Sequence, residues 1–180
     1  MKDLMVDLET WGTSTNAVIV QIGAVYFNRY TGETGDEFTV NVDPQSGINA
    51  GFQVDGDTIL WWMNQSRLAR LSIIDADRHD IGVAMEWFNN FWSRAKYVWS
   101  HATFDFTILM NHLNRLGIKS KTHYRAARDI RTLTHLAQPL IRKPDMIFPE
   151  RPKDNVAHNA LSDCHYQVEY CVNCFNAIMR

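Results

Sequence analysis

Two carboxylates interrupt the first apolar run of the chain, and their spacing points to chemistry. Asp7 and Glu9 lie two residues apart within residues 4–10, a run typical of a buried strand. Alternate residues of a strand share one face, so both side chains would lie together, roughly 7 Å apart along the backbone. Two buried carboxylates repel each other and are costly to desolvate. A divalent cation such as Mg²⁺ or Mn²⁺, which prefers oxygen ligands, would remove that cost. The alternative is a strand end that exposes both acids to water.

Two further acids and a histidine stand near the starts of predicted helices. Asp105 follows the short apolar run 97–100, and Asp163 lies near the start of the last helical pattern. Either position also suits a carboxylate that only stabilises the positive end of a helix dipole. His158 precedes Asp163 by five residues, a spacing that would turn the two side chains apart on one continuous helix. We therefore expect His158 on the loop just before the helix, where a base can close on substrate.

Hydrophobic spacing predicts the elements that position these residues. Apolar and alternating runs predict strands over residues 3–9, 17–28, 38–42, 97–100 and 126–130. Helical spacing predicts helices over residues 58–71, 81–94, 104–116, 131–136 and 160–178. Residues 138–155, which hold four of the five prolines, form a predicted loop. This order predicts an α/β fold in a single domain, residues 1–180, with a mixed sheet of about five strands flanked by helices.

The composition fits a globular protein without a membrane segment. The 180 residues are 46% hydrophobic and 21% charged, with a formal net charge of −2. This charge excludes a strongly basic coat protein, so any nucleic acid would be gripped over a short stretch. No secretory leader and no apolar run of about 18 residues is visible, so we expect no membrane contact. An odd number of cysteines, close together, indicates a reducing compartment and a cytoplasmic location.

Cysteines and basic residues form lesser patterns. Cys164, Cys171 and Cys174 fall on one face of the last helix, which favours a buried stripe over a zinc site. Basic residues gather in two stretches that suit phosphate contacts or a solvated surface: Arg115, Lys119, Lys121, Arg125, Arg128 and Arg131, then Arg142, Lys143, Arg151 and Lys153. The second stretch leads into His158, so it is the better candidate for a lid over substrate.

The acidic motifs and their order resemble a known enzyme family. Asp7-x-Glu9, Phe104-Asp105 and His158-x-x-x-x-Asp163 resemble the three motifs of the DEDDh 3′–5′ exonucleases, which belong to the ribonuclease H-like superfamily. Residues 20–25 are also similar to that family. Residues 58–66 and 128–133 look closer to a small subfamily that includes a phage-encoded exonuclease and the mycobacterial-type exoribonuclease.

The resemblance implies a site and a reaction. Asp7, Glu9, Asp105 and Asp163 would hold two Mg²⁺ or Mn²⁺ ions about 4 Å apart, one carrying the attacking water and one steadying the leaving 3′-oxygen. His158 would be the general base, since imidazole can accept a proton near neutral pH. The implied reaction releases nucleoside 5′-monophosphates from the 3′ end of single-stranded nucleic acid. The resemblance also implies a homodimer, located in the host cytoplasm if the chain is phage-encoded.

Four residues beside the motifs are candidates for binding the substrate: Thr10, Trp11, Trp62 and Phe104. Trp62 and its neighbour Trp61 diverge by about 100° on a helix. One of them can therefore lie in the core while the other stacks a base, or both can be core residues. Phe104 has the same two interpretations.

Two positions depart from the family pattern. His101 stands four residues before Asp105, where many relatives have asparagine, and Trp11 separates Thr10 from Gly12, where many relatives have Thr-Gly. Both departures concern substrate contacts near the terminal nucleotide and leave the metal ligands intact.

We therefore expect a metal-dependent 3′–5′ exonuclease, with RNA and DNA both open as substrates. The alternative from another class is a catalytically silent nucleic-acid-binding domain of the same fold. The complete set of acids and base argues against it, because a silent domain has no use for them.

Overall fold

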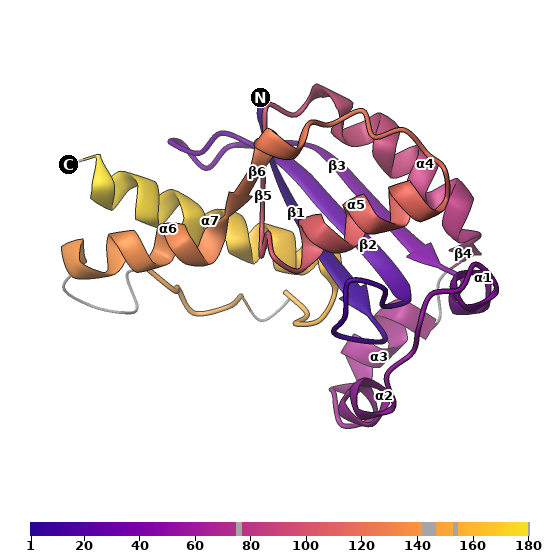
Figure 1. The fold of residues 1–180 in the computed structure, drawn as a ribbon. Helices are drawn as coiled ribbons and strands as arrows, with labels where there is room; N and C mark the ends of the chain where they lie inside the picture. Colours follow the sequence, from indigo (N-terminus) through magenta and orange to yellow (C-terminus); the bar gives the residue numbers. More distant parts are fainter. Residues whose placement is uncertain (75–76, 142–146, 153–154, 180) are drawn as a thin grey trace.

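The computed structural model describes residues 1–179, except residues 75–76, 142–146 and 153–154. The described residues form a mixed sheet of six strands in the order β4-β3-β2-β1-β5-β6 (Figure 1). The strands are β1 (Asp3–Thr10), β2 (Ile19–Phe27), β3 (Thr34–Val42), β4 (Arg78–His79), β5 (Tyr97–Ser100) and β6 (Ala127–Asp129). The first three form an antiparallel meander, while β5 runs parallel to β1 and β6 runs parallel to β5. The predicted mixed α/β architecture is confirmed.

Helices surround this sheet. In the described residues the α-helices are α1 (Pro44–Asn49), α2 (Gly56–Met63), α3 (Arg67–Ile74), α4 (Ile81–Phe91), α5 (Asp105–Arg115), α6 (Ile130–Ala137) and α7 (Ala160–Ile178). Short 3-10 turns are η1 (Trp92–Arg94), η2 (Tyr124–Ala126) and η3 (Gln138–Leu140). None of the described helices combines the length and the apolar character needed to cross a bilayer.

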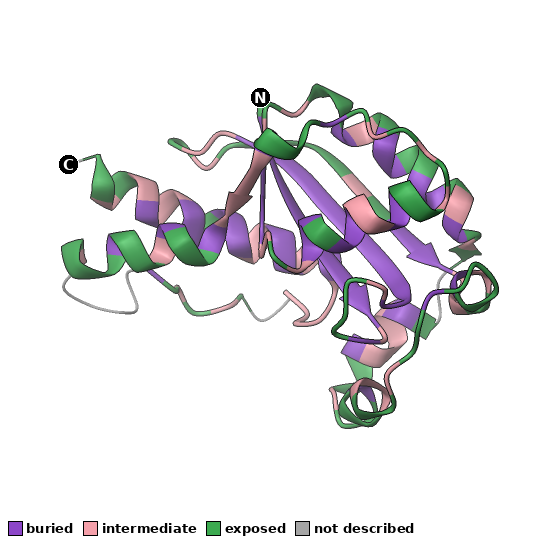
Figure 2. Cartoon of the chain, viewed as in Figure 1, coloured by how far each residue is buried: buried purple, intermediate pink, exposed green. Residues whose placement is uncertain are grey.

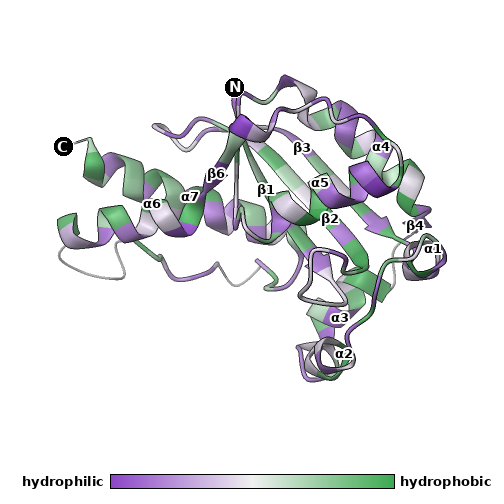
Figure 3. Ribbon diagram, in the orientation of Figure 1, coloured by the Kyte–Doolittle hydropathy of each residue, from purple (hydrophilic) through white to green (hydrophobic). Residues whose placement is uncertain are grey.

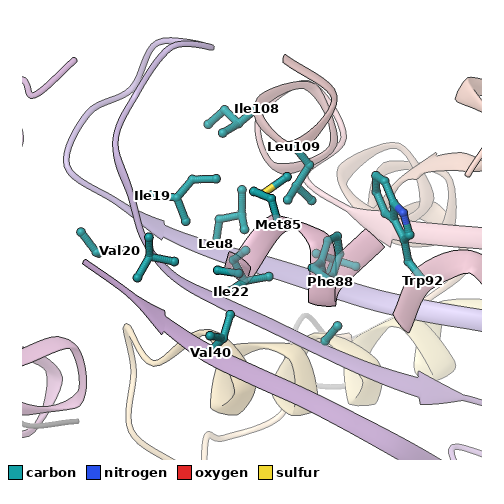
Figure 4. Close-up of a cluster of buried hydrophobic side chains, with 14 of the residues drawn as sticks. Leu8, Ile19, Val20, Ile22, Val40, Met85, Phe88, Trp92, Ile108 and Leu109 are labelled. Carbon is teal, nitrogen blue, oxygen red and sulfur yellow. The ribbon is translucent and has the colours of Figure 1, made fainter. Parts of the chain in front are cut away.

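Each face of the sheet has its own hydrophobic core, because side chains alternate along β1. Leu4, Val6 and Leu8 pack with side chains of α4 and α5, including Phe88 and Leu109 (Figure 4). On the other face, residues of β1, β2 and β5 pack with α6 and α7. The central strands β1 and β2 are therefore buried along their whole length, whereas most of β3 and the short edge strands β4 and β6 are exposed or partly exposed. The helices are buried mainly on the side that faces the sheet (Figure 2). The helices also carry separate hydrophobic and hydrophilic stripes (Figure 3).

The helix predicted over residues 58–71 is two helices, α2 and α3, with a break at 64–66. Side chains at the break bond to the backbone and compete with a continuous helix. The side-chain amides of Asn64 and Gln65 donate to the backbone carbonyls of Leu60 and Trp61. The Ser66 hydroxyl accepts from the backbone amide of Ala69. The Ser66 contact is an N-cap for α3, so the chain restarts rather than continues.

Apart from 3-10 turns, the described residues form two further elements that sequence patterns did not predict. Helix α1 begins at Pro44 after Asp43, whose carboxylate accepts from the amide of Gln45. Strand β4 has two residues and pairs with the end of β3, which is why the sheet has six strands instead of about five. Two residues are too few to show a strand period.

A glycine allows α7 to begin directly against the sheet. A Cβ on Gly23 of β2 would lie 2.3 Å from the carbonyl carbon of Ala160, the first residue of α7. The neighbouring Gln21 accepts from the amide of Ala160 at 2.7 Å through its Oε1. Since Gly23 pairs with Asp7 and Gln21 pairs with Glu9, this contact places the first turn of α7 over the carboxylates of β1.

We predict that Gly23→Ala destabilises the protein by about 1–3 kcal/mol, the usual cost of overpacking. Replacing a strand glycine by alanine would otherwise tend to stabilise, so the steric clash decides the sign. Chemical unfolding followed by circular dichroism measures the effect. Gly56→Ala is the matched control, because nothing lies within 4 Å of its added Cβ. Equal stability of Gly23→Ala and wild type would contradict the close approach of α7.

Candidate active site

The site begins at the carboxyl-terminal end of β1. Asp7 and Glu9 follow Met5 at alternate positions, so their side chains lie on the face of the sheet that α7 covers. They are only 8% and 7% exposed, which confirms the prediction of a buried pair and rules out a solvated strand end. Gln167 of α7 donates to Asp7 Oδ1 at 2.6 Å.

Two helix starts bring in the other carboxylates. Asp105 is the first residue of α5, and its Oδ2 accepts from the amide of His101 at 2.9 Å. Asp163 lies in the first turn of α7, which Asn159 caps by accepting from the amide of Ser162. The four predicted acids all line one cavity of about 560 Å³ together with His158. The structure therefore brings together every residue predicted for the catalytic and metal-binding set.

Within this cavity the donors form two adjacent groups. One oxygen or nitrogen each of Asp7, His101 and Asp105 lie within 4.8 Å of one another. The same holds for Glu9, His158 and Asp163. His101 is thus a member of the cluster, at a position where the sequence showed only a departure from the family pattern.

Burial and mutual repulsion dominate the electrostatics of the acids. Burial, reinforced by the charges of Asp105, Glu9 and Asp163, raises the pKa of Asp7 well above its usual range. Burial also raises the pKa of Asp105 to about 7. The pKa of Glu9 is raised by burial and by Asp163. Ionised at neutral pH without a cation, this cluster stores unfavourable energy.

The residues present fit a pair of hard divalent cations. Carboxylate oxygens are the ligands that Mg²⁺ and Mn²⁺ prefer. Two further observations indicate a place for positive charge and for a polar ligand. The Arg151 guanidinium donates to Asp163 Oδ1 at 2.5 Å, so a cation already lies against the cluster. Gln167 Oε1 is buried and has no hydrogen-bond partner among the described residues.

His158 lies where it was predicted, on the loop two residues before α7. Its backbone has a φ of 62°, in the left-handed region that residues other than glycine seldom adopt. Its amide donates to Asp163 Oδ2 at 3.0 Å, and its ring lies 4.8 Å from that of Trp61 at 80°. The hydrogen bond fixes the backbone of His158, and the edge-to-face contact positions its imidazole in the lining of the cavity.

A second cavity of about 430 Å³ adjoins the first along Glu9. Thr10, Trp62 and Phe104, three of the four predicted substrate-binding residues, line it together with Trp61. Trp62 is only 5% exposed and its indole donates to the carbonyl of Thr10 at 2.9 Å. Trp61 is 44% exposed and lines both cavities. The adjacent tryptophans diverge as predicted, and Trp61 is the one that faces open space.

The fourth candidate, Trp11, lines neither cavity. Its side chain packs against the core on the α4 and α5 face, and its carbonyl accepts from the amide of Asp55. Trp11 lies beyond the end of β1 and after the register shift between Glu9 and Thr10, so the strand period that points Asp7 and Glu9 toward the site does not extend to it.

Some site residues escaped the sequence argument. Gln167 is four residues after Asp163, so helical spacing could have placed both on one face of α7. Arg131, which the sequence placed only in a basic stretch suited to phosphate contacts, lies at the start of α6, lines the cavity of the four acids and joins burial in lowering the pKa of His101. Three cations predicted for the proline-rich loop, Arg142, Lys143 and Lys153, lie outside the described residues. The cysteine stripe is confirmed: Cys164, Cys171 and Cys174 are buried and free.

Solved structures of two exonucleases have a fold similar to that of this chain. Escherichia coli exonuclease I in complex with single-stranded DNA is similar with a TM-score of 0.64 at 12% identity, over 92% of this chain and 38% of that one. Exonuclease X in complex with 5′-overhanging duplex DNA has a TM-score of 0.60 at 15% identity, over 97% and 91% of the two chains. The chain thus spans about two fifths of exonuclease I. Identities this low establish the fold alone.

Sequence comparison identifies the family. No curated protein sequence matches the chain. A family model described as the 3′–5′ exoribonuclease Rv2179c-like domain matches residues 2–175. The chain therefore belongs to this family of 3′–5′ exonucleases, as the motifs around Asp7, Asp105 and Asp163 predicted.

Proposed function

We propose that this protein is a metal-dependent exonuclease that hydrolyses single-stranded nucleic acid from the 3′ end to nucleoside 5′-monophosphates. The observation that carries the proposal is the convergence of Asp7, Glu9, Asp105 and Asp163 with His158 around one cavity. The description of the family favours RNA as the substrate. DNA is the alternative, because the structural neighbours were solved in complex with DNA.

The four carboxylates would hold two Mg²⁺ or Mn²⁺ ions, with Asp7 and Asp105 in one donor group and Glu9 and Asp163 in the other. Bound there, such ions would activate a water molecule and stabilise the charge that develops on the phosphate and the leaving oxygen. Hydrogen bonds orient three of these carboxylates. Gln167 donates to Asp7, and the backbone amides of His101 and His158 donate to Asp105 and Asp163. Ligand orientation of this kind supports metal affinity.

His158 is proposed as the general base. His158 lines the cavity with a ring nitrogen close to Glu9 and Asp163, where it can accept a proton from the attacking water. The imidazole contacts Trp61, which would also contact the terminal nucleotide. Binding of substrate could therefore set the position of the base.

The adjoining cavity is proposed to hold the terminal nucleotide. Trp61 offers an exposed indole, and stacking of a base on such a ring is worth about 1–3 kcal/mol. Phe104 forms part of the same wall, next to Asp105. Buried Trp62 would contribute indirectly, because the hydrogen bond from its indole fixes the carbonyl of Thr10, one residue after Glu9. The homodimer and the cytoplasmic location remain predictions.

The activity is tested with matched RNA and DNA oligonucleotides carrying a 5′ label, with Mg²⁺ or Mn²⁺ and with EDTA. We expect a ladder that shortens from the 3′ end, faster on RNA, and no cleavage in EDTA. Glu9→Gln should lower the rate by about 10²–10³-fold or more, since it weakens charge stabilisation in the transition state. Glu86→Gln, an exposed glutamate on α4, is the matched control and should match wild type. Full activity in excess EDTA would contradict the mechanism, and tight binding without any cleavage would favour the silent binding domain.

A second experiment separates the base from the ligands. His158→Ala should lower turnover by about 10²–10⁴-fold, the scale of a positioned general base, while Mn²⁺ binding stays largely intact. The defect should shrink as pH rises, because hydroxide then needs no base. Calorimetric titration of Mn²⁺ compares this variant with Asp7→Asn, which should lose metal. His135→Ala, an exposed histidine on α6, is the control. If His158→Ala loses the metals as fully as Asp7→Asn, His158 is a ligand instead.

A further inference from the structure

Cations gather on one tyrosine at the far end of the sheet from the acids. The Tyr97 ring centroid lies 4.3 Å from the Arg29 guanidinium carbon, 4.7 Å from that of Arg128 and 5.2 Å from the Lys96 ammonium. Arg29 is paired with Asp3. Within the described part of the chain, Lys96 and Arg128 have no carboxylate within salt-bridge distance. Two unneutralised charges lie close together in a protein whose net charge is −2.

Arg128 is oriented by the backbone. One of its guanidinium nitrogens donates to the carbonyls of Arg125 and Ala127, at 2.8 and 2.7 Å. The remaining donors of the planar group are left for an oxygen anion, which an arginine can bind with two parallel hydrogen bonds. Lys96 is exposed, and Arg125 adds a third cation beside Tyr124.

This cluster shares a face and an edge with the catalytic cavity. Tyr97 pairs with Asp3 and Trp99 pairs with Met5, so Tyr97 lies on the face of the sheet that carries Asp7 and Glu9. Arg128 belongs to β6, the strand at the sheet edge (Figure 1). Directly after β6, Arg131 at the start of α6 lines the cavity. Arg128 and Arg131 therefore place positive charge at the cluster and at the site, with Asp129 between them in the chain and its carboxylate accepting from the amides of Ala102 and Thr132.

We propose that Lys96 and Arg128 bind phosphates of the substrate strand, several nucleotides before the 3′ end that is cleaved. This rests on the proposed function for the direction of the strand. Tyr97 begins β5 and Ser100 ends it, directly before His101 of the cavity, so the cluster and the site are separated by about three strand residues, or about 10 Å. A stacked strand advances about 3.4 Å per nucleotide, so the cluster lies about three or more nucleotides from the site. The partner is a nucleic acid strand longer than the cavity can hold.

The competing explanation is protection of the edge. Charged side chains on an edge strand also prevent it from pairing with another chain. The two explanations differ in what they predict for oligonucleotides of different length, because protection against aggregation does not depend on substrate.

The test is binding of 5′-fluorescein RNA of 3 and 12 nucleotides in EDTA, followed by fluorescence anisotropy at several salt concentrations. Lys96→Gln/Arg128→Gln should weaken binding of the 12-mer about tenfold at 0.1 M salt, and lower its salt slope by about 1.4, as expected for two lost phosphate contacts. The effect on the 3-mer should be much smaller. Arg128→Lys, which keeps the charge but loses the two parallel hydrogen bonds, should keep the wild-type salt slope while losing part of the affinity.

The control removes the same two charges elsewhere. Lys119→Gln/Arg78→Gln changes an exposed loop lysine and an arginine of β4, the strand at the opposite edge. It should leave binding of the 12-mer unchanged. Lys96→Glu alone, at an exposed side chain, provides a second variant if the double change unfolds the protein. Wild-type affinity of the Lys96 and Arg128 variants for the 12-mer, or an equal loss for both oligonucleotides, would overturn the proposal. Because anisotropy measures binding and not cleavage, this readout stays valid even if the protein does not cleave RNA.

Discussion

Repulsion among buried carboxylates is the constraint around which the molecule is organised. Asp7 and Glu9 share a face of the central strand, and Asp105 and Asp163 face them from the first turns of α5 and α7. The fold enforces this arrangement with uncharged contacts beside the carboxylates, above all the close approach of α7 to Gly23, the cross-strand partner of Asp7. Hydrophobic cores on both faces of the sheet hold these elements together. Packing thus sustains an arrangement that electrostatics alone would oppose.

The same repulsion explains the surroundings of the cluster. Arg151 lies against Asp163, and amides of the neighbouring loops donate to Asp105 and Asp163. The proposed substrate would bring a negatively charged phosphate backbone to this cluster of carboxylates. Two positive side chains of the cavity wall, Arg131 and Arg151, would reduce the repulsion between the carboxylates and these phosphates. The cations on Tyr97 would extend that effect along the strand.

Much of this arrangement could be predicted because it depends on local periodicity. Period two along β1 placed Asp7 and Glu9 together, and the five-residue spacing placed His158 before α7. The orientation of the two tryptophans could not be predicted, because it depends on how α2 docks against Thr10. The contact of Arg151 with Asp163 likewise joins a loop to a helix start through tertiary structure. The break between α2 and α3 was missed because side-chain bonds to the backbone leave no periodic pattern.

The central claim, that cations relieve the strain of these carboxylates, is tested most directly by stability against pH. Asp105 has its pKa raised to about 7, and burial also raises those of Asp7 and Glu9, so the folded state holds protons that the unfolded chain releases above about pH 4. The free energy of unfolding without metal should therefore fall as pH rises from 5 to 8. Saturating Mn²⁺ should restore it at pH 8 and change it little at pH 5. Metal-free stability that rises over this range, or that Mn²⁺ leaves unchanged at pH 8, would contradict the account.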